Sequence, residues 1–287
     1  MRQEHSFTAG DLSPLPWLEV VNPRIRLRCV RHALFDFDGT VSVIRRGWEN
    51  IMIPMMIEMI CDGHASTPDI EGEVAEYVDR STGILTIKQM EWLEEAIYRF
   101  GLARSVKTAR EYKRIYNERL LNPVHRRVSQ IDGTLTSRDQ FMVEGARAFL
   151  QGLYDNGVTL YLVSGTDNPY VLEEAEVLGI TQYFGMRIYG ALDDTEANTK
   201  EKIIQRILEN HHLRGEELLV VGDGPVEIHN AKDRDAVTLG VAVDEDKRCS
   251  LNPRKRLRLL AAGVDLIVTD FLHHQELLEY LVSSRDR

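Results

Sequence analysis

The second half of the chain alternates apolar runs with amphipathic stretches, and this alternation restricts the fold more than any other feature. From Val158 onward the apolar runs are VTLYLV (158–163), ELLVVG (217–222), DAVTLGVAV (235–243) and DLIVTD (265–270), with YFGMRIYG (183–190) as a weaker one. Helical patterns lie between or after them, at 168–178, 199–212, 253–262 and 271–283. Continuous apolar strands separated by helices predict a doubly wound α/β fold, in which helices cover both faces of a parallel sheet.

A further apolar run, ALFDF (33–37), has the same buried-strand character, but no second strand follows it soon. Helical patterns come instead, at 47–60, 70–80, 86–100 and 105–121, before the β/α alternation resumes with a helix over 141–155. This order predicts a helical module inserted after the first strand. We expect an irregular N-terminal lead-in at 1–24, an α/β core formed by 25–46 and 138–287, and a helical module at 47–137. The alternation I-R-L-R-C at 25–29 also allows a short edge strand.

Composition excludes several classes of protein. The chain has 287 residues and a formal net charge of −10, which disfavours nucleic-acid binding, since that depends on neutralising phosphates. No apolar run is long enough to cross a membrane, and the first residues lack the apolar segment of a secretory signal. The three cysteines are scattered and form no C-x-x-C motif. We therefore expect a cytoplasmic protein with neither nucleic-acid nor membrane partners.

Polar residues follow three of the apolar runs, at the points where the predicted strands end. Asp36 and Asp38 follow the first, Ser-Gly-Thr (164–166) follows VTLYLV, and Gly-Asp-Gly (222–224) follows ELLVV, with Glu227 one helical turn later. In parallel α/β sheets, ligands bind beyond the carboxyl ends of the strands. If these strands are neighbours, the three segments converge on one site.

The expected site contains several carboxylates, which cannot all stay ionised at close range without a counter-charge. A divalent cation with oxygen ligands supplies one, and Mg²⁺ in particular is held by a few carboxylates together with substrate phosphate oxygens and water. The sequence therefore predicts a Mg²⁺ site. It also suggests a chemistry in which a carboxylate attacks a phosphoryl group held at the metal.

Four segments in this order, DFDGT (36–40 within FDFDGT), SGT (164–166), a lysine at the start of a helix, and GDGPVE (222–227), resemble the motifs of the haloacid dehalogenase superfamily of phosphohydrolases. The resemblance covers residues 31 to 283, and the helical module is similar to the mobile cap of that family. It implies an aspartyl-phosphate mechanism that works by positioning and electrostatic stabilisation of the phosphoryl group.

The resemblance assigns a role to each acid. Asp36 is the expected nucleophile, and Asp38 is the general acid for the leaving oxygen and then the base for the attacking water. Asp36, the backbone carbonyl of Asp38 and Asp223 are expected to bind Mg²⁺. Glu227 matches the second acid of the last motif and is expected to act through a metal-bound water.

The resemblance also predicts the phosphate-binding groups. The Ser164 side chain and the Gly165 amide would hold the phosphoryl oxygens, and Lys200 would neutralise charge on the phosphoryl group and on Asp36. Lys202 is a rival, although Lys200 fits the family spacing better. Arg45 and Arg46 fall where the family places a flap over the site, and they are candidate substrate contacts.

Two other polar segments have simpler interpretations. Asp132-Gly133-Thr134 repeats the letters DGT, but no buried strand precedes it, so a turn is expected there. The basic run Arg254 to Arg258 begins a helix and is expected to be a solvated face.

The expected function is Mg²⁺-dependent hydrolysis of a small phosphorylated metabolite, such as a sugar phosphate. A phosphomutase of the β-phosphoglucomutase kind shares all four motifs and stays an alternative. A non-catalytic module that binds a phosphorylated metabolite is the third, although such a module has no need of an attacking carboxylate.

Overall fold

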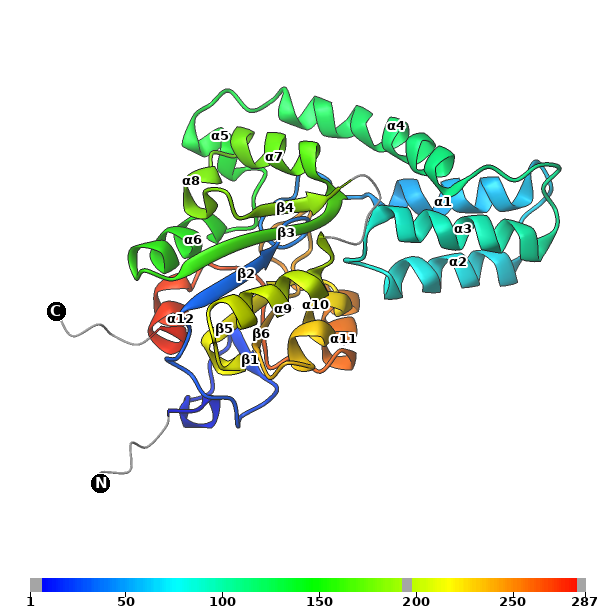
Figure 1. Cartoon of the computed structure of the whole chain (residues 1–287). Coiled ribbons are helices and arrows are strands. Elements are labelled where there is room, and N and C mark those ends of the chain that lie inside the picture. Colours follow the sequence, from blue (N-terminus) through cyan, green and yellow to red (C-terminus); the bar gives the residue numbers. More distant parts are fainter. Residues whose placement is uncertain (1–6, 193–197, 283–287) are drawn as a thin grey trace.

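The computed structural model describes residues 7–192 and 198–282 and contains a seven-stranded sheet (Figure 1). The strand order is β1-β7-β6-β5-β2-β3-β4, and only β1 runs antiparallel to its neighbour. The strands are β1 (Leu18–Val20), β2 (His32–Asp36), β3 (Thr159–Asp167), β4 (Ile188–Ala191), β5 (Leu218–Gly222), β6 (Val237–Val241) and β7 (Leu266–Val268). The predicted doubly wound α/β fold is confirmed, and β2 lies at its centre between β3 and β5.

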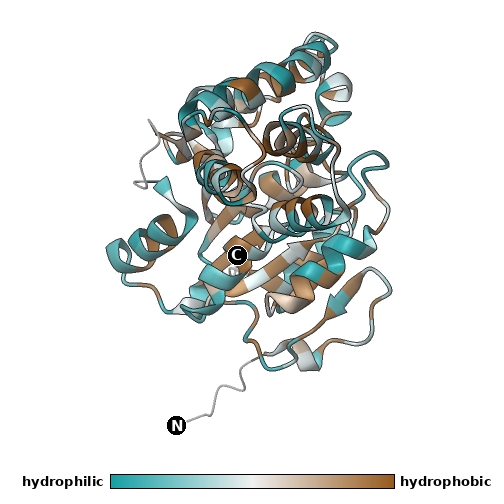
Figure 2. Cartoon of the chain, turned by 90° about the vertical axis from the view of Figure 1, so that its right-hand side faces the viewer, coloured by the Kyte–Doolittle hydropathy of each residue, from teal (hydrophilic) through white to brown (hydrophobic). Residues whose placement is uncertain are grey.

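Alternate residues of the central strand pack against opposite faces of the sheet, as the period of two in a strand requires. Ala33 and Phe35 of β2 lie in one apolar cluster, together with Phe149 of helix α6 (Ala146–Asp155) and Leu277 of α12 (His274–Leu281). Leu34 lies in a second cluster, with residues of α9 (Lys200–Asn210) and α10 (Pro225–Lys232). Both faces are therefore buried, and Figure 2 shows the strands as predominantly hydrophobic ribbons.

The remaining helices of the core follow the strands in the predicted order. They are α7 (Asn168–Val177), the short α8 (Thr181–Phe184) and α11 (Pro253–Ala261). A pair of single-turn 3-10 helices, η1 (Ala9–Asp11) and η3 (Gly215–Glu217), lies in connecting segments. The weak apolar run at 183–190 divides between α8 and β4.

The chain leaves the sheet after β2 and forms four helices before it returns. They are α1 (Glu49–Cys61), α2 (Pro68–Arg80), α3 (Thr86–Phe100) and α4 (Ala109–Val128), and the short α5 (Leu135–Asp139) follows them. In Figure 1, α1, α2 and α3 project to the right of the sheet, while α4 extends back toward α7. We call the segment 47–137 the cap, and its exact boundaries stay a prediction. Met52, Met55 and Met56 of α1 are buried, and they belong to the same apolar cluster as Ala33 and Phe35 of β2.

The N-terminal segment packs against the core, and its strand is not where the alternation at 25–29 placed one. Leu18–Val20 forms the edge strand, paired with β7, while residues 25–29 contain only an isolated bridge from Arg26 to Thr8. Leu27 is nevertheless 2% exposed and belongs to the main core. The alternation therefore reflected a half-buried extended segment that lacks a neighbouring strand.

The ends of α11 and the start of α7 differ in how they are capped. Asn252 caps α11 by accepting hydrogen bonds from the amides of Arg254 and Lys255, and Gly263 follows this helix with φ of +81°. Asn168 precedes a proline, as an N-cap residue often does, but α7 begins at Asn168 itself, after Asp167. Its side chain accepts a hydrogen bond from the Gly190 amide instead, so it joins α7 to β4.

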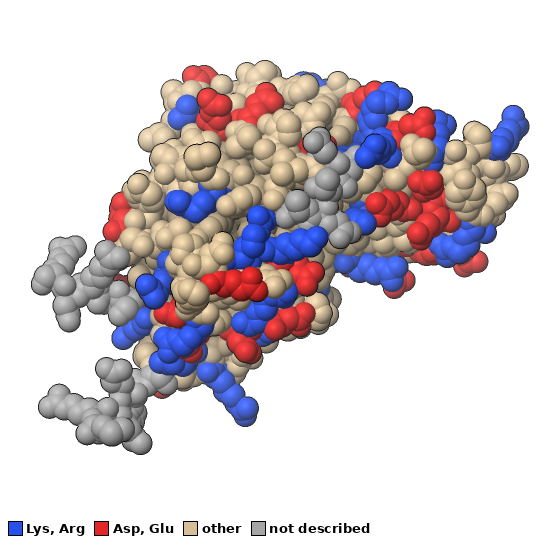
Figure 3. Space-filling view, viewed as in Figure 1, with Lys and Arg blue, Asp and Glu red and all other residues tan. Residues whose placement is uncertain are grey.

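No helix in the described part of the chain is long and apolar enough to cross a membrane. Lysines and arginines are interspersed with acidic residues over the face in Figure 3. That face therefore shows no large basic area of the kind that phosphate backbones attract.

Candidate active site

Asp36 is the last residue of β2, and the chain after it turns tightly at the carboxyl edge of the sheet. The carbonyl oxygen of Phe37 accepts hydrogen bonds from the amides of Val41 and Ser42, both at 2.9 Å. Gly39 has φ of +75°, and a Cβ atom there would lie 2.5 Å from an Asp223 carboxylate oxygen. Glycine is therefore needed twice over, for the backbone conformation and for the close approach of Asp223.

Asp38 is held by two hydroxyls from β3. Its Oδ2 atom accepts hydrogen bonds from Ser164 Oγ at 3.1 Å and Thr166 Oγ1 at 3.2 Å. Its Oδ1 atom is buried and has no hydrogen-bond partner in the described structure. Burial raises the pKa of Asp38, although Arg45 and the two hydroxyls partly oppose the shift. A carboxyl group with a raised pKa and one oxygen without a hydrogen bond is suited to donate a proton.

Lys200, the first residue of α9, joins two of the acids. Its Nζ atom lies 2.8 Å from Asp36 Oδ1 and 2.8 Å from Glu227 Oε2. All three side chains are buried. Burial alone would lower the pKa of Lys200, but the negative charges of Asp36 and Glu227 outweigh it and raise the pKa. The lysine is thus held as an ammonium beside the candidate nucleophile.

Asp36, Asp223 and Glu227 form the acidic cluster that could hold a metal ion. Each offers one oxygen atom, and the three atoms lie within 4.8 Å of one another. The pKa of Asp36 is raised well above its ordinary value, first because the group is buried and then because Glu227 and Asp223 repel its charge. Lys200 alone therefore does not compensate the cluster. A set of three carboxylates with hard oxygen donors fits Mg²⁺.

Glu227 is fixed by the turn that leads into α10. The Gly224 amide donates a 2.7 Å hydrogen bond to Glu227 Oε1, while Oε2 binds Lys200. A Cβ atom at Gly222 would lie 2.2 Å from the same Oε1 atom. Both carboxylate oxygens are already engaged by protein donors, which agrees with the expectation that Glu227 acts at one remove from the metal.

The motifs predicted to converge do converge, since β5, β2 and β3 are adjacent. The sequence model of the haloacid dehalogenase-like hydrolases matches residues 30–233, most of the chain. The chain belongs to this family. The resemblance seen in the sequence is thereby confirmed, and so is the class of enzyme, a hydrolase.

Known proteins similar to this hydrolase agree in fold. A predicted phosphatase from Clostridium acetobutylicum shares 18% identity with a TM-score of 0.55, over 87% of this chain and 99% of that one. A β-phosphoglucomutase from Clostridium difficile shares 16% with a TM-score of 0.52, over 86% and 96%. A copper-exporting P-type ATPase B from Enterococcus hirae is 33% identical over 99 residues, which are 34% of this chain and 11% of the ATPase. This hydrolase therefore spans only about a tenth of that relative's length.

The loop between α2 and α3 of this hydrolase reaches into the site from the cap. A Cβ atom at Gly165 would lie 2.2 Å from the Ile84 carbonyl oxygen, and one at Gly83 would lie 2.6 Å from Glu227 Oε2. A Cβ atom at Gly224 would lie 2.9 Å from the Thr82 carbonyl oxygen. Glycines on both sides thus allow the cap to lie directly against the catalytic residues.

A cavity lies between the cap and the carboxyl edge of the sheet, and Asp36, Asp38 and Asp223 line its floor. Aromatic and apolar side chains contribute to its walls together with neutral polar ones. The wall residues include Trp48, Ile84, Thr86, Gln89, Tyr116, Asn117 and Leu120. Ser164 and Gly165 also line the cavity, so two of the three predicted phosphate-binding residues face the same space as the three acids. The third, Lys200, is not among the lining residues and contacts Asp36 at 2.8 Å.

The two arginines predicted as candidate substrate contacts differ in position. Arg45 lines the cavity, is 5% exposed, and binds Glu174 of α7 at 2.6 Å, with its Nε atom 3.8 Å from Asp38 Oδ1. Arg46 points away, toward the exposed Asp246 at 3.3 Å, and is absent from the residues that line this cavity. The geometry thus favours Arg45 alone. Lys202, the rival of Lys200, is exposed, and its backbone amide donates a hydrogen bond to the Thr199 cap.

Several residues of the site carry no sequence signal that singles them out. Thr166 belongs to the SGT segment, but its contact with Asp38 depends on an irregularity in β3 between Val163 and Asp167. Glu174 resembles its neighbours in a helix rich in glutamate. The loop Thr82-Gly83-Ile84 could have been suspected only from its glycine between two predicted helices.

Lys255 and Arg258 contradict the expectation for the basic run. They were expected on a solvated face, but they are only 7% and 8% exposed, and both contact Asp223. Burial would raise the pKa of Asp223, but these two cations outweigh that effect and lower it. The segment Asp132–Thr134 forms the predicted turn, in which Asp132 accepts hydrogen bonds from Thr134.

Proposed function

We propose that this hydrolase is a Mg²⁺-dependent phosphatase that cleaves a small phosphorylated metabolite through an aspartyl-phosphate on Asp36. The proposal depends on one observation: two carboxylates that lie two residues apart have different surroundings. Asp36 contacts the Lys200 ammonium at 2.8 Å, whereas Asp38 contacts the hydroxyls of Ser164 and Thr166 and has one oxygen without a hydrogen bond in the described structure. One is arranged to attack, and the other to carry a proton.

In the first step, a carboxylate oxygen of Asp36 forms a bond to phosphorus while the bond from phosphorus to the leaving oxygen breaks. Asp38, in its protonated form, gives its proton to that leaving oxygen. In the second step, Asp38 takes a proton from a water molecule, the water oxygen bonds to phosphorus, and the bond to Asp36 breaks. Alcohol and inorganic phosphate are released, and both carboxyl groups return to their first state.

Asp36, the Asp38 carbonyl and Asp223 would hold Mg²⁺, which would supply positive charge to the phosphoryl oxygens. Lys200 adds a fixed ammonium at Asp36, and the Gly165 amide and the Ser164 hydroxyl line the same space. Ser164 donates to Asp38 here, so phosphate binding would require its hydroxyl to turn. These groups act by electrostatic stabilisation rather than by covalent chemistry.

The cavity supports a leaving group that is neutral and rich in hydroxyls. The cation nearest to its outer part, Arg45, is engaged by Glu174, and the acid Asp167 is engaged by Lys113 at 2.6 Å. The remaining walls offer aromatic faces, amides and a threonine hydroxyl. Such a lining suits a monosaccharide better than a second phosphate or a carboxylate, because either of those would seek an unpaired cation.

A phosphomutase is the second candidate, and the position of the cap loop favours it. Thr82, Gly83 and Ile84 lie against Gly224, Glu227 and Gly165, a closed arrangement that would exclude water from the phosphorylated Asp36. The two functions predict different products. A mutase returns the phosphoryl group to the sugar, whereas a phosphatase releases phosphate.

The experiment is a screen of phosphorylated metabolites with the full chain and Mg²⁺, scoring released phosphate. The panel should contain monosaccharide monophosphates, sugar bisphosphates and phosphorylated short carboxylic acids. We expect phosphate release with a monosaccharide monophosphate and loss of activity with a chelator. An isomerised sugar phosphate without release would indicate the mutase. Binding that raises the melting temperature without any product would contradict both and leave a non-catalytic binding module.

A further inference from the structure

The basic segment of α11 places two cations behind the candidate metal site. Lys255 and Arg258 are three residues apart, so their side chains leave the helix on one face. That face is turned inward, whereas Arg254 is exposed and Leu257 is 63% exposed. The helix therefore buries two charged side chains next to the fully buried Leu259, which is unusual for lysine and arginine. The burial of these two cations must be explained by the groups that they contact.

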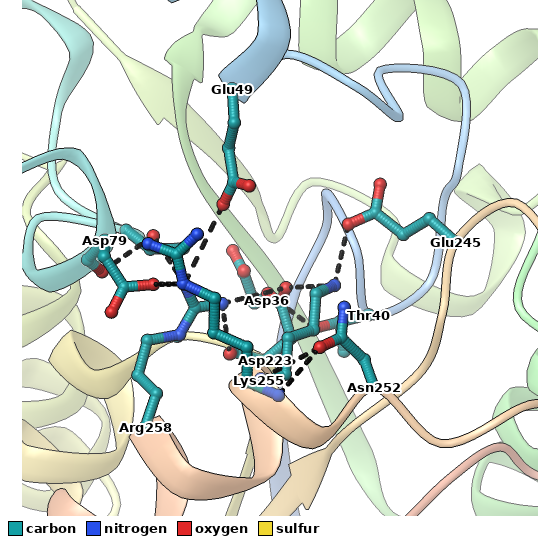
Figure 4. A network of polar contacts seen from close by, with 12 residues as sticks. Asp36, Thr40, Glu49, Asp79, Asp223, Glu245, Asn252, Lys255 and Arg258 are labelled. Carbon is teal, nitrogen blue, oxygen red and sulfur yellow. Dashed lines mark hydrogen bonds and ion pairs between the residues drawn. The ribbon is translucent and has the colours of Figure 1, made fainter. Parts of the chain in front are cut away.

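Lys255 makes two short contacts. Its Nζ atom lies 2.7 Å from Asp223 Oδ2 and 2.7 Å from Glu245 Oε1. Arg258 supports the same residue, since its Nη2 atom donates to the Asp223 carbonyl oxygen at 3.1 Å. Figure 4 shows these side chains around Asp223. One ammonium, of Lys255, and one guanidinium, of Arg258, thus contact Asp223.

Lys255 contacts one of the two carboxylate oxygens of Asp223. Oδ2 binds Lys255, whereas Oδ1 has only a long contact of 3.5 Å from the Thr40 hydroxyl. A cation shared with Asp36 and Glu227 would therefore use the Oδ1 side of Asp223. Lys255 fixes the rotation of the carboxylate and so presents this oxygen to the cluster.

The positive charge of Lys255 also affects the binding of a metal ion at Asp223. Two positive charges near each other repel, and inside a protein this repulsion is far stronger than in bulk water. An ammonium bound to a metal-binding carboxylate must therefore weaken the affinity of that carboxylate for a divalent cation. Glu245 opposes this effect, because it binds the same ammonium from the other side.

We propose that Lys255 is a built-in counter-charge of the metal site, which orients Asp223, stabilises the metal-free protein and lowers its affinity for Mg²⁺. Glu245 determines how strongly Lys255 lowers that affinity. Lys255 is a positioning residue rather than a catalytic one, because it acts through Asp223. The inference rests on the metal site of the proposed function. It is tested by binding and stability, so its failure is separate from a failure to hydrolyse phosphate esters.

The experiment measures Mg²⁺ binding by isothermal titration calorimetry, and melting temperature with and without Mg²⁺, for the full chain and three variants. Lys255→Met removes the ammonium and should bind Mg²⁺ at least about 10-fold more tightly, with a lower melting temperature that Mg²⁺ restores. Glu245→Gln leaves Lys255 to act on Asp223 alone and should weaken Mg²⁺ binding about 3- to 10-fold.

The matched control is Lys232→Met, which breaks a 2.6 Å contact between a lysine and a buried aspartate, Asp265, outside the cluster. It should lower stability without changing Mg²⁺ affinity.

Opposite changes in affinity for Lys255→Met and Glu245→Gln would support the proposal, since loss of packing alone cannot raise affinity. Equal or weaker binding by a folded Lys255→Met variant would overturn it. If Lys255→Met does not fold even with Mg²⁺, Glu245→Gln decides the matter, and unchanged affinity in that variant would also overturn the proposal. Absence of Mg²⁺ binding by the unmodified chain would also overturn the proposal.

Discussion

The Nζ atom of Lys200 lies 2.8 Å from Asp36 Oδ1, although the entire cap and strand β3 separate the two residues in the chain. This contact brings a fixed positive charge to the carboxylate that we propose as the nucleophile. The same ammonium also contacts Glu227, so that it links the end of β2 to the first turn of α10. The predictions below follow from this site and from the packing that supports it.

Replacing Asp36 with asparagine should abolish turnover while the fold stays intact. Asparagine has nearly the same shape as aspartate, and Lys200 keeps Glu227 as a partner, but an amide cannot attack phosphorus. We expect phosphate release to fall at least about 1,000-fold. The control is Asp246→Asn, at an exposed acid that binds Arg46 outside the cavity. Turnover by Asp36→Asn at the parent rate, with circular dichroism unchanged, would show that the mechanism is wrong.

Asp38→Asn should lose activity in proportion to how much the leaving group needs a proton. With a sugar phosphate we expect a loss of about 100- to 10,000-fold, whereas 4-nitrophenyl phosphate, whose leaving group departs without protonation, should lose less. The raised pKa of Asp38 also sets a pH dependence. The acid form is lost as pH rises through that pKa, so the alkaline decline of kcat should disappear in the variant. An equal loss for both substrates would argue against a proton-donating role.

Gly39→Ala should reduce activity more than a strained turn alone explains. Its φ is +75°, and the new Cβ atom would lie 2.5 Å from Asp223 Oδ2, so both the backbone and the metal-binding acid must move. Gly63→Ala is the matched control, because Gly63 has φ of +88° and a Cβ atom added there would meet nothing within 4 Å. Each variant should lose about 1 kcal/mol of unfolding free energy from strain, and Gly39→Ala more. Only Gly39→Ala should lose activity and Mg²⁺ affinity.

The pair of Arg45 and Glu174 should show strong energetic coupling. Both side chains are buried and meet at 2.6 Å, so removing Arg45 leaves Glu174 without this counter-charge, and removing Glu174 leaves Arg45 with only its longer contact to Asp38 at 3.8 Å. We expect Arg45→Met and Glu174→Leu each to cost about 3–5 kcal/mol, and the double variant to be more stable than either single one. Chemical denaturation of the four proteins measures this coupling. Additive losses would mean that the pair contributes only through separate packing contacts.

His32 should make the protein less stable in mild acid. Its ring lies 3.1 Å from the Tyr161 hydroxyl, which in turn lies 3.1 Å from His211. Burial, followed by the charges of His211 and Arg31, lowers the pKa of His32 to about 4. The unfolded chain therefore binds a proton first as pH falls below about 6.5, and the stabilisation is lost progressively toward pH 4.

We expect this histidine to account for roughly 1–2 kcal/mol of the fall in unfolding free energy between pH 7 and pH 5. The measurement compares denaturation of the unmodified chain and His32→Gln at both pH values, since the remaining titrating groups are common to the two. An identical decline in the two proteins would remove His32 as the cause.

Sequence alone was sufficient for the parallel strands of the sheet and for the main acids, but not for the edge strand β1. Continuous apolar runs such as those of β2 and β5 are buried wherever they occur, because apolar side chains need only to leave water. The ends of parallel strands then meet by geometry, so the order of the motifs along the chain was enough to bring Asp36, Asp38, Ser164 and Asp223 together. The roles assigned to them came from the family resemblance of the same motifs.

The burial and the contacts of the charged residues became known only from the tertiary structure. Arg45 and Arg46 are adjacent and chemically identical, yet one is buried against Glu174 and the other faces Asp246. Lys255 and Arg258 likewise lie inside, while Leu257 on the same helix is exposed. A charged side chain can be buried only where a counter-charge and hydrogen bonds await it, and these partners come from distant parts of the chain. Apolar burial is thus readable from the residue itself, whereas the burial of charge depends on a partner that only the folded chain supplies.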